Sequence, residues 1–245
     1  MGARRNTGRL GSFLLGALVI AVLSAPASAQ AVLQIGTRVN QNTPTTQQQA
    51  NAIAAYLELI SGYTVQLAPQ NPNNQPPFWT VQLGAAVQNA NKPVGHALVL
   101  ALINSARTIT IVVSAGGDVG VTSCANGFQK VQVGAQANAC KETNGNPGPG
   151  SDAIVELASV PASVLTDADT PRYIVVAHEL IHALHVTIGR RLTTNSNNEA
   201  RTIGPYAGYN GAQNPPLIPG FQFTENALRG ENTYSNSKSP ARLTL

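Results

Sequence analysis

Two histidines and a glutamate in the motif HELIH, at residues 178–182, have the types and the spacing of a zinc site. On an α-helix, side chains four positions apart lie on one face about 6 Å apart, so His178 and His182 can bind a single zinc ion. Glu179 then lies beside them and can accept a proton from zinc-bound water. Mostly apolar residues surround the motif at 174–184, which predicts a buried helix whose polar groups need partners. A metal ion supplies these partners, whereas two surface histidines beside a solvated glutamate would lie among polar residues.

A third protein ligand has to come from outside this helix, because catalytic zinc ions keep three protein ligands and one water. The metzincin continuation HExxHxxGxxH is absent, since His185 stands at its glycine position and Ile188 at the position of its third histidine. The remaining carboxylates are Glu199, Glu225 and Glu231. Glu199 is the best candidate, because its separation from the motif lets a return helix pass beside the first.

The two other histidines have different expected roles. His185 lies on the same face of the helix, but about 10 Å along the axis from His178. That is too far to share a metal ion, so we expect His185 to support the site or to line its cleft. His96, alone among apolar neighbours, is interpreted as a structural histidine.

Three segments carry a resemblance to a known family. HELIHALH, NEARTIG at 198–204 and FTENALRGE, which ends at Glu231, resemble the NleD-type effector zinc metallopeptidases. HELIHALH and EARTIG are also similar to parts of the clostridial neurotoxin light chains. The resemblance covers about residues 170–231 and is looser upstream.

This resemblance implies roles for individual residues. It implies that His178, His182 and Glu199 bind zinc and that Glu179 is the general base. It also implies that Arg201 and the segment Thr224-Glu225-Asn226 support the site.

The group that stabilises the oxyanion is less well defined, because the Arg/Tyr segment typical of the family is not cleanly present near the C-terminus. Tyr206, Tyr209, Arg229 and Tyr234 are the alternatives. Tyr209 and Arg229 are the two that we carry forward as candidates for this role.

The predicted function is a secreted zinc endopeptidase. Zinc polarises the scissile carbonyl and lowers the pKa of its water, while Glu179 takes the proton and passes it to the leaving amine. A zinc hydrolase acting on a non-peptide amide or acyl substrate is one alternative. A catalytically silent binding domain with a structural zinc is another.

The elements around the motif alternate between helices and short strands. Pro171 opens the metal-binding helix and Gly189 ends it. Apolar periodicity and β-branched runs predict helices at 44–61, 93–106 and near 224–229, and strands at 63–67, 78–83, 108–113 and 153–157. The Gly/Asn-rich residues 114–152 are expected to form a loop or hairpin excursion. The mixed order predicts an α+β, zincin-like fold with the HExxH helix packed on a small sheet.

The N-terminal segment has the features of a secretory signal peptide. Three arginines without acids precede the apolar run 13–23, and Ala27-Ser28-Ala29 is a small-residue cleavage pattern. We therefore expect residues 1–29 to be removed and residues 30–245 to form one domain, exported to the periplasm or the extracellular space. No stable insertion into a membrane is expected after cleavage.

Composition and charge narrow the class further. The chain has 245 residues, of which 43% are hydrophobic and 11% charged, as in one globular domain with polar loops. Its formal net charge of +4 falls to +1 without the three N-terminal arginines. No basic patch interleaved with aromatics follows, so nucleic-acid binding is not expected, and a polypeptide is the predicted partner.

Export places Cys124 and Cys140 where thiols are normally oxidised. A bridge between them would close a loop of about 15 residues and contribute about 3 kcal/mol in the chain-entropy model. We therefore predict a structural disulfide. Their spacing does not fit a CxxC redox pair or a cysteine metal site.

Overall fold

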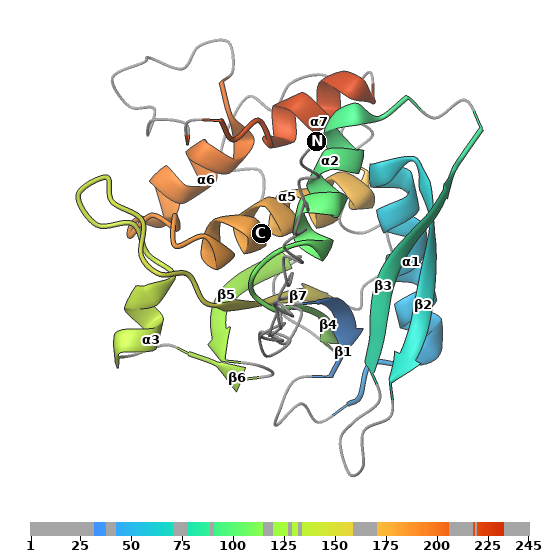
Figure 1. Ribbon diagram of the computed structural model, residues 1–245, viewed down its shortest axis with the longest axis horizontal. Helices are drawn as coiled ribbons and strands as arrows, with labels where there is room; N and C mark the ends of the chain where they lie inside the picture. Colours follow the sequence, from blue (N-terminus) through green and yellow to red (C-terminus); the bar gives the residue numbers. More distant parts are fainter. Residues whose placement is uncertain are drawn as a thin grey trace, which may run out of the picture. The chain divides into compact units, whose positions relative to one another are not determined.

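A seven-stranded mixed sheet and six helices make up the part of the chain that the computed structural model describes (Figure 1). The described residues are 32–37, 43–70, 78–88, 91–114, 120–126, 129–131, 134–158, 171–205, 218 and 220–232. The elements follow one another along the chain in the order β1 (Leu33–Gly36), α1 (Gln47–Ser61), β2 (Tyr63–Gln70), β3 (Phe78–Ala86), α2 (Pro93–Ile103), β4 (Ile109–Ser114), β5 (Gly120–Asn126), β6 (Gln129–Lys130), α3 (Gly134–Ala139), β7 (Asp152–Ala158), α5 (Arg172–Thr187), α6 (Asn195–Ile203) and α7 (Glu225–Glu231). The fold class is therefore α+β.

The sheet has parallel strands at its centre and antiparallel strands at its edges. The strand order is β2-β3-β1-β4-β7-β5-β6, with β4 parallel to both β1 and β7. Strands β2 and β3 form an antiparallel pair at one edge, and β5 runs antiparallel to β7 near the other. Alternate residues of β1, β4 and β7, such as Ile35, Ile111 and Val155, point into the main core.

Helix α5 is central to this core. It contacts α1, α2, α6 and α7 as well as strands β5 and β7. Every residue from Ile174 to Thr187 is buried, including the histidines and the glutamate of the motif. The helix begins after Pro171 and is followed by Gly189, which has φ 69°. A Cβ atom at Gly189 would lie 2.1 Å from the carbonyl oxygen of Gly148, so only glycine fits this close turn.

Most of the expected elements are present. The helices predicted at 44–61, 93–106, 171–188 and 224–229 are confirmed, as are the four predicted strands. Helix α1 begins with a capping box in which Thr46 and Gln49 exchange hydrogen bonds, and ends at Gly62 in the left-handed conformation. Residues 195–203 form the return helix that the position of Glu199 suggested.

Two expectations need correction. Strand β1 was not expected, although its four residues are buried between β3 and β4. Residues 114–152 are not merely a loop or hairpin excursion, because β5 pairs with β7 from Gly120 to Ala125 and so belongs to the main sheet. Cys124, on β5, forms the predicted disulfide with Cys140.

The predicted signal peptide lies outside the described residues. Residues Ala31–Leu245 form one compact unit. Of the helices in the described residues, none has both the length and the hydropathy needed to cross a membrane.

Candidate metal centre

Two imidazoles and one carboxylate converge between α5 and α6. Nε2 of His178 lies 2.9 Å from one carboxylate oxygen of Glu199, and Nε2 of His182 lies 3.1 Å from the other. The two Nε2 atoms are 3.0 Å apart. Ligands at tetrahedral corners, each about 2.0–2.1 Å from zinc, lie about 3.3 Å from one another, so the three groups are spaced as the ligands of one ion. Among the described residues, His178, His182 and Glu199 form the group that could hold a metal ion.

Helix α6 brings Glu199 to the histidines through contacts made by its neighbours. Arg201 is buried, and its guanidinium donates to the carboxylate of Glu142 at 2.8 Å and to the carbonyl oxygen of Arg190 at 2.9 Å. These bonds fix α6 to the loop after α5 and to the segment after α3. The helix ends at Gly204, where a Cβ atom would lie 2.7 Å from the side chain of Thr224. Arg201 therefore joins α6 to these two segments, and the supporting role that the resemblance implies stays a prediction.

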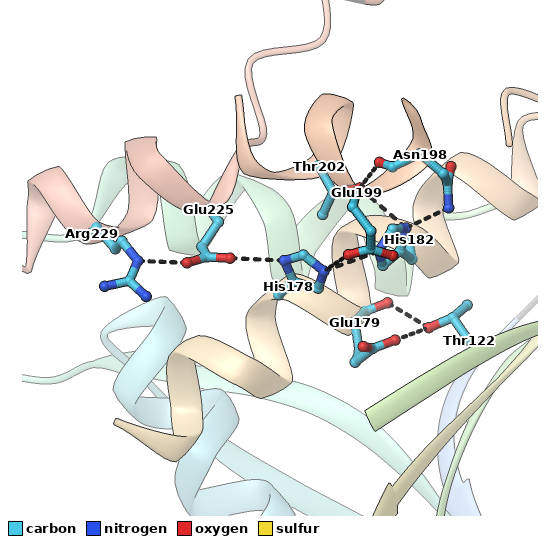
Figure 2. A network of polar contacts seen from close by, with 9 residues as sticks. All are labelled: Thr122, His178, Glu179, His182, Asn198, Glu199, Thr202, Glu225 and Arg229. Carbon is cyan, nitrogen blue, oxygen red and sulfur yellow. Dashed lines mark hydrogen bonds and ion pairs between the residues drawn. The ribbon is translucent and has the colours of Figure 1, made fainter. Parts of the chain in front are cut away.

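The second nitrogen of His178 is held by a buried chain of charges. Nδ1 donates to Glu225 at 2.8 Å, and the other oxygen of Glu225 accepts from Nε of Arg229 at 2.5 Å (Figure 2). Thr224 caps α7 by accepting from the backbone N–H of Ala227, which places Glu225 in the first turn. The hydrogen bond from Nδ1 to Glu225 fixes the His178 tautomer that leaves a lone pair on Nε2 for a metal.

Burial and the hydrogen-bond partners shift the pKa values of His178, Glu199 and Glu225 in opposite directions. Burial alone would lower the pKa of His178, but the carboxylates of Glu199 and Glu225 raise it to about 10. Burial opposes ionisation of Glu199, yet hydrogen bonds from His178 and His182 lower its pKa. The pKa of Glu225 is likewise lowered, despite burial, by His178 and Arg229. Both carboxylates are therefore ionised at neutral pH, and a metal ion has to displace a proton from His178.

The second nitrogen of His182 faces α6. Nδ1 lies 2.9 Å from the amide nitrogen of Asn198, which can donate to it, and 3.1 Å from the hydroxyl of Thr202. Thr202 donates its hydroxyl proton to the carbonyl oxygen of Asn198. Nε2 of His182 faces the carboxylate of Glu199 at 3.1 Å.

Glu179 lies beside the cluster and is oriented by strand β5 (Figure 2). The hydroxyl of Thr122 lies 2.7 Å from one carboxylate oxygen of Glu179 and 3.0 Å from its carbonyl oxygen. Gly120, two residues earlier on the same face of β5, approaches closely, since a Cβ atom there would lie 2.5 Å from Cγ of Glu179. The strand therefore defines where this carboxylate can lie.

The remaining predicted residues have the following positions. His185 is buried and packs against Phe221 with ring centroids 4.9 Å apart, and within the described part of the chain neither of its ring nitrogens has a hydrogen-bond partner. Arg229 lies behind Glu225, away from the metal cluster, and is 1% exposed. This position gives Arg229 a part in holding Glu225 rather than in stabilising an oxyanion. Tyr209, like Tyr206 and Tyr234, lies outside the described residues.

His96 stacks on the ring of Tyr63 at 4.0 Å between centroids. Among the described residues, His96 is not part of the group that could hold a metal ion, and its structural role stays a prediction.

Sequence reasoning missed several contacts of the site. Asn198 and Thr202 flank Glu199 and lie four residues apart on α6, so helical spacing could have placed both on the face of His182. Thr122, on a distant strand, carries no such local signal. Comparison with protein-family models, with curated proteins and with solved structures finds no match to the chain.

Proposed function

We propose that this protein is a zinc-dependent endopeptidase, with His178, His182 and Glu199 as the zinc ligands and Glu179 as the general base. The observation that carries the proposal is the spacing of the three ligand atoms, all within 4.8 Å of one another, beside a glutamate on the same helix. Two imidazoles and a carboxylate are a ligand set that zinc prefers in hydrolytic sites. The proposal includes the resemblance to NleD-type metallopeptidases and a zincin-like arrangement of α5 on the sheet.

The chemistry divides between the ion and the protein. A zinc ion bound there would polarise the scissile carbonyl and lower the pKa of a water molecule at the position left open by three protein ligands. Glu179 accepts the proton of that water and delivers it to the leaving amine. Thr122 orients Glu179 for both transfers, and Glu225 holds His178 in the tautomer that can bind metal.

A peptide substrate is supported by the edge of the sheet next to Glu179. Strand β6 pairs only with Ala125 and Asn126 of β5. Along Gly120–Ser123, the outer edge of β5 faces no other strand of the described residues. Such an edge can pair with an extended peptide, and its main chain would then run past Glu179. This favours a polypeptide over a small amide or acyl substrate.

An open metal position also favours catalysis over a structural zinc. Among the described residues, three side chains form the group that could bind metal, and Glu225 faces the opposite nitrogen of His178. Structural zinc sites are usually closed by four protein ligands. The Cys124–Cys140 disulfide supports our further proposal that the protein acts outside the reducing cytoplasm.

The test compares two variants of the purified, zinc-loaded protein on a peptide library. Glu179→Gln should keep its zinc and lose about 10²- to 10⁴-fold in activity, the usual contribution of a general base. His178→Ala should lose both zinc and activity, while His96→Ala, outside the site, should retain both. If the parent protein with stoichiometric zinc cleaves no peptide and Glu179→Gln behaves identically, the peptidase proposal is wrong.

A further inference from the structure

Arg191 lies in the short segment between α5 and α6, where its backbone is fixed on both sides. Its N–H donates to the carbonyl oxygen of Cys140 at 3.0 Å, and its own carbonyl oxygen accepts from Glu142 N–H at 2.8 Å. One guanidinium nitrogen lies 3.4 Å from Sγ of Cys124. The disulfide between Cys124 and Cys140 therefore holds Arg191 against strand β5.

This position is close to the proposed general base. Cys124 and Thr122 lie two residues apart on the core-facing side of β5, which is about 7 Å along a strand. Thr122 is the residue whose hydroxyl lies 2.7 Å from Glu179. The charges of Glu179 and Glu199 both act on the guanidinium of Arg191, although burial, the larger effect, lowers its pKa. The positive charge of Arg191 thus lies about two strand residues, or about 7 Å, from the contact between Thr122 and Glu179.

The charge of Arg191 is not balanced by an ion pair, unlike the charges of the two arginines near it. Arg190 and Arg201 both lie within ion-pair distance of Glu142, at 3.4 and 2.8 Å. Arg191 has no carboxylate within that distance among the described residues, and the contact of its guanidinium is with a disulfide sulfur. A partly buried guanidinium with no anion in ion-pair contact is only partly compensated by the more distant charges of Glu179 and Glu199, so the site gains when a ligand brings a carboxylate into contact.

We propose that Arg191 is a specificity-determining residue that binds a carboxylate of the peptide substrate close to the scissile bond. The inference rests on the proposed function. The offset of about 7 Å from the contact with Glu179 equals the distance between alternate side chains of an extended peptide paired with β5. A side-chain carboxylate or a free C-terminus fits this offset, whereas the scissile carbonyl has to lie at Glu179 itself.

The test measures kcat/KM for matched peptides with the parent protein, Arg191→Gln and Arg191→Lys. One set replaces Glu by Gln at each position near the cleaved bond, and a second replaces the C-terminal carboxylate by an amide. The parent should prefer the charged member of at least one pair by about tenfold, the lower end for a hydrogen bond to a charged group. Arg191→Gln should abolish this preference, and Arg191→Lys should keep part of it. Arg190→Gln, which removes the adjacent charge, should leave it unchanged.

The outcomes separate this inference from the proposed function. Loss of the Glu preference or of the C-terminal preference in Arg191→Gln supports the inference, and the set that responds identifies the source of the carboxylate. Equal loss of activity on charged and neutral peptides, with the zinc content retained, would mean that Arg191 acts on the site itself and would overturn the inference. A parent without any preference also overturns it while leaving the peptidase proposal intact. No cleavage of any peptide overturns both.

Discussion

Replacing Gly120 by alanine should disable Glu179 without touching the metal ligands. A Cβ atom at Gly120 would lie 2.5 Å from Cγ and 3.0 Å from Cδ of Glu179. Carbon atoms in ordinary contact are about 3.5–4.0 Å apart, so the glutamate has to move by about 1 Å or more. The movement also strains the 2.7 Å contact with Thr122. A misplacement of about 1 Å can cost about 100-fold in rate, and we expect Gly120→Ala to lose activity on that order.

The assay measures kcat/KM on a peptide that the parent protein cleaves, together with zinc content and thermal unfolding. Zinc should stay stoichiometric, because Gly120 contacts no ligand of the cluster. Gly230→Ala in α7 is the matched control, since no atom lies within 4 Å of the added Cβ and its activity should equal that of the parent. A folded, zinc-loaded Gly120→Ala protein with parental activity would refute the assignment of Glu179 as a base positioned by β5.

Three other predictions follow from the contacts of the site and from the disulfide. Glu225→Gln should lower zinc affinity about 10- to 100-fold and the free energy of unfolding by about 3–5 kcal/mol, because Arg229 is left buried without its carboxylate. Adding Arg229→Met should restore stability but not affinity, and chelator competition that shows parental affinity would contradict this. His178, with its pKa raised to about 10, is protonated at neutral pH and has to lose that proton to bind zinc. Zinc affinity should therefore rise with pH, by about tenfold per pH unit for each proton displaced. An affinity that is constant between about pH 6 and 8 would argue against this competition. Replacing Cys124 and Cys140 by serine should lower the free energy of unfolding by about 3 kcal/mol in urea titrations, since it opens a loop with a sequence separation of 16. Unchanged stability would show that the disulfide does not constrain the unfolded chain.

The candidate metal-binding group could be predicted because its arrangement is mostly local. His178 and His182 lie on one face of a helix whose apolar pattern is visible in the sequence, and this required no knowledge of the sheet. Glu199 required only that a second helix return past the first. The pairing of Glu225 with Arg229 was also visible, since the two lie four residues apart on a helix, and it would have shown that Arg229 is already engaged.

Strand β5 and its contacts could not be predicted in this way. Its sequence GVTSCAN has only two β-branched residues, Val121 and Thr122, among small and polar ones, and its conformation depends on pairing with β7. Thr122 is 57 residues from Glu179 in the sequence, and Arg191 is 67 residues from Cys124. Such contacts depend on the order of strands in the sheet, which local periodicity does not encode.

The balance of charge around the cluster connects the metal ion with the role proposed for Arg191. Glu179, Glu199 and Glu225 bring three negative charges, and the buried Arg229 compensates one of them. Two negative charges then remain, and the carboxylates of Glu199 and Glu225 raise the pKa of His178. A divalent cation would balance two charges and take the place of the proton on His178. Arg191 adds one positive charge that no described carboxylate pairs with at ion-pair distance. Under the proposed function, a substrate carboxylate would restore neutrality, and the zinc-loaded site would favour an anionic peptide over a neutral one.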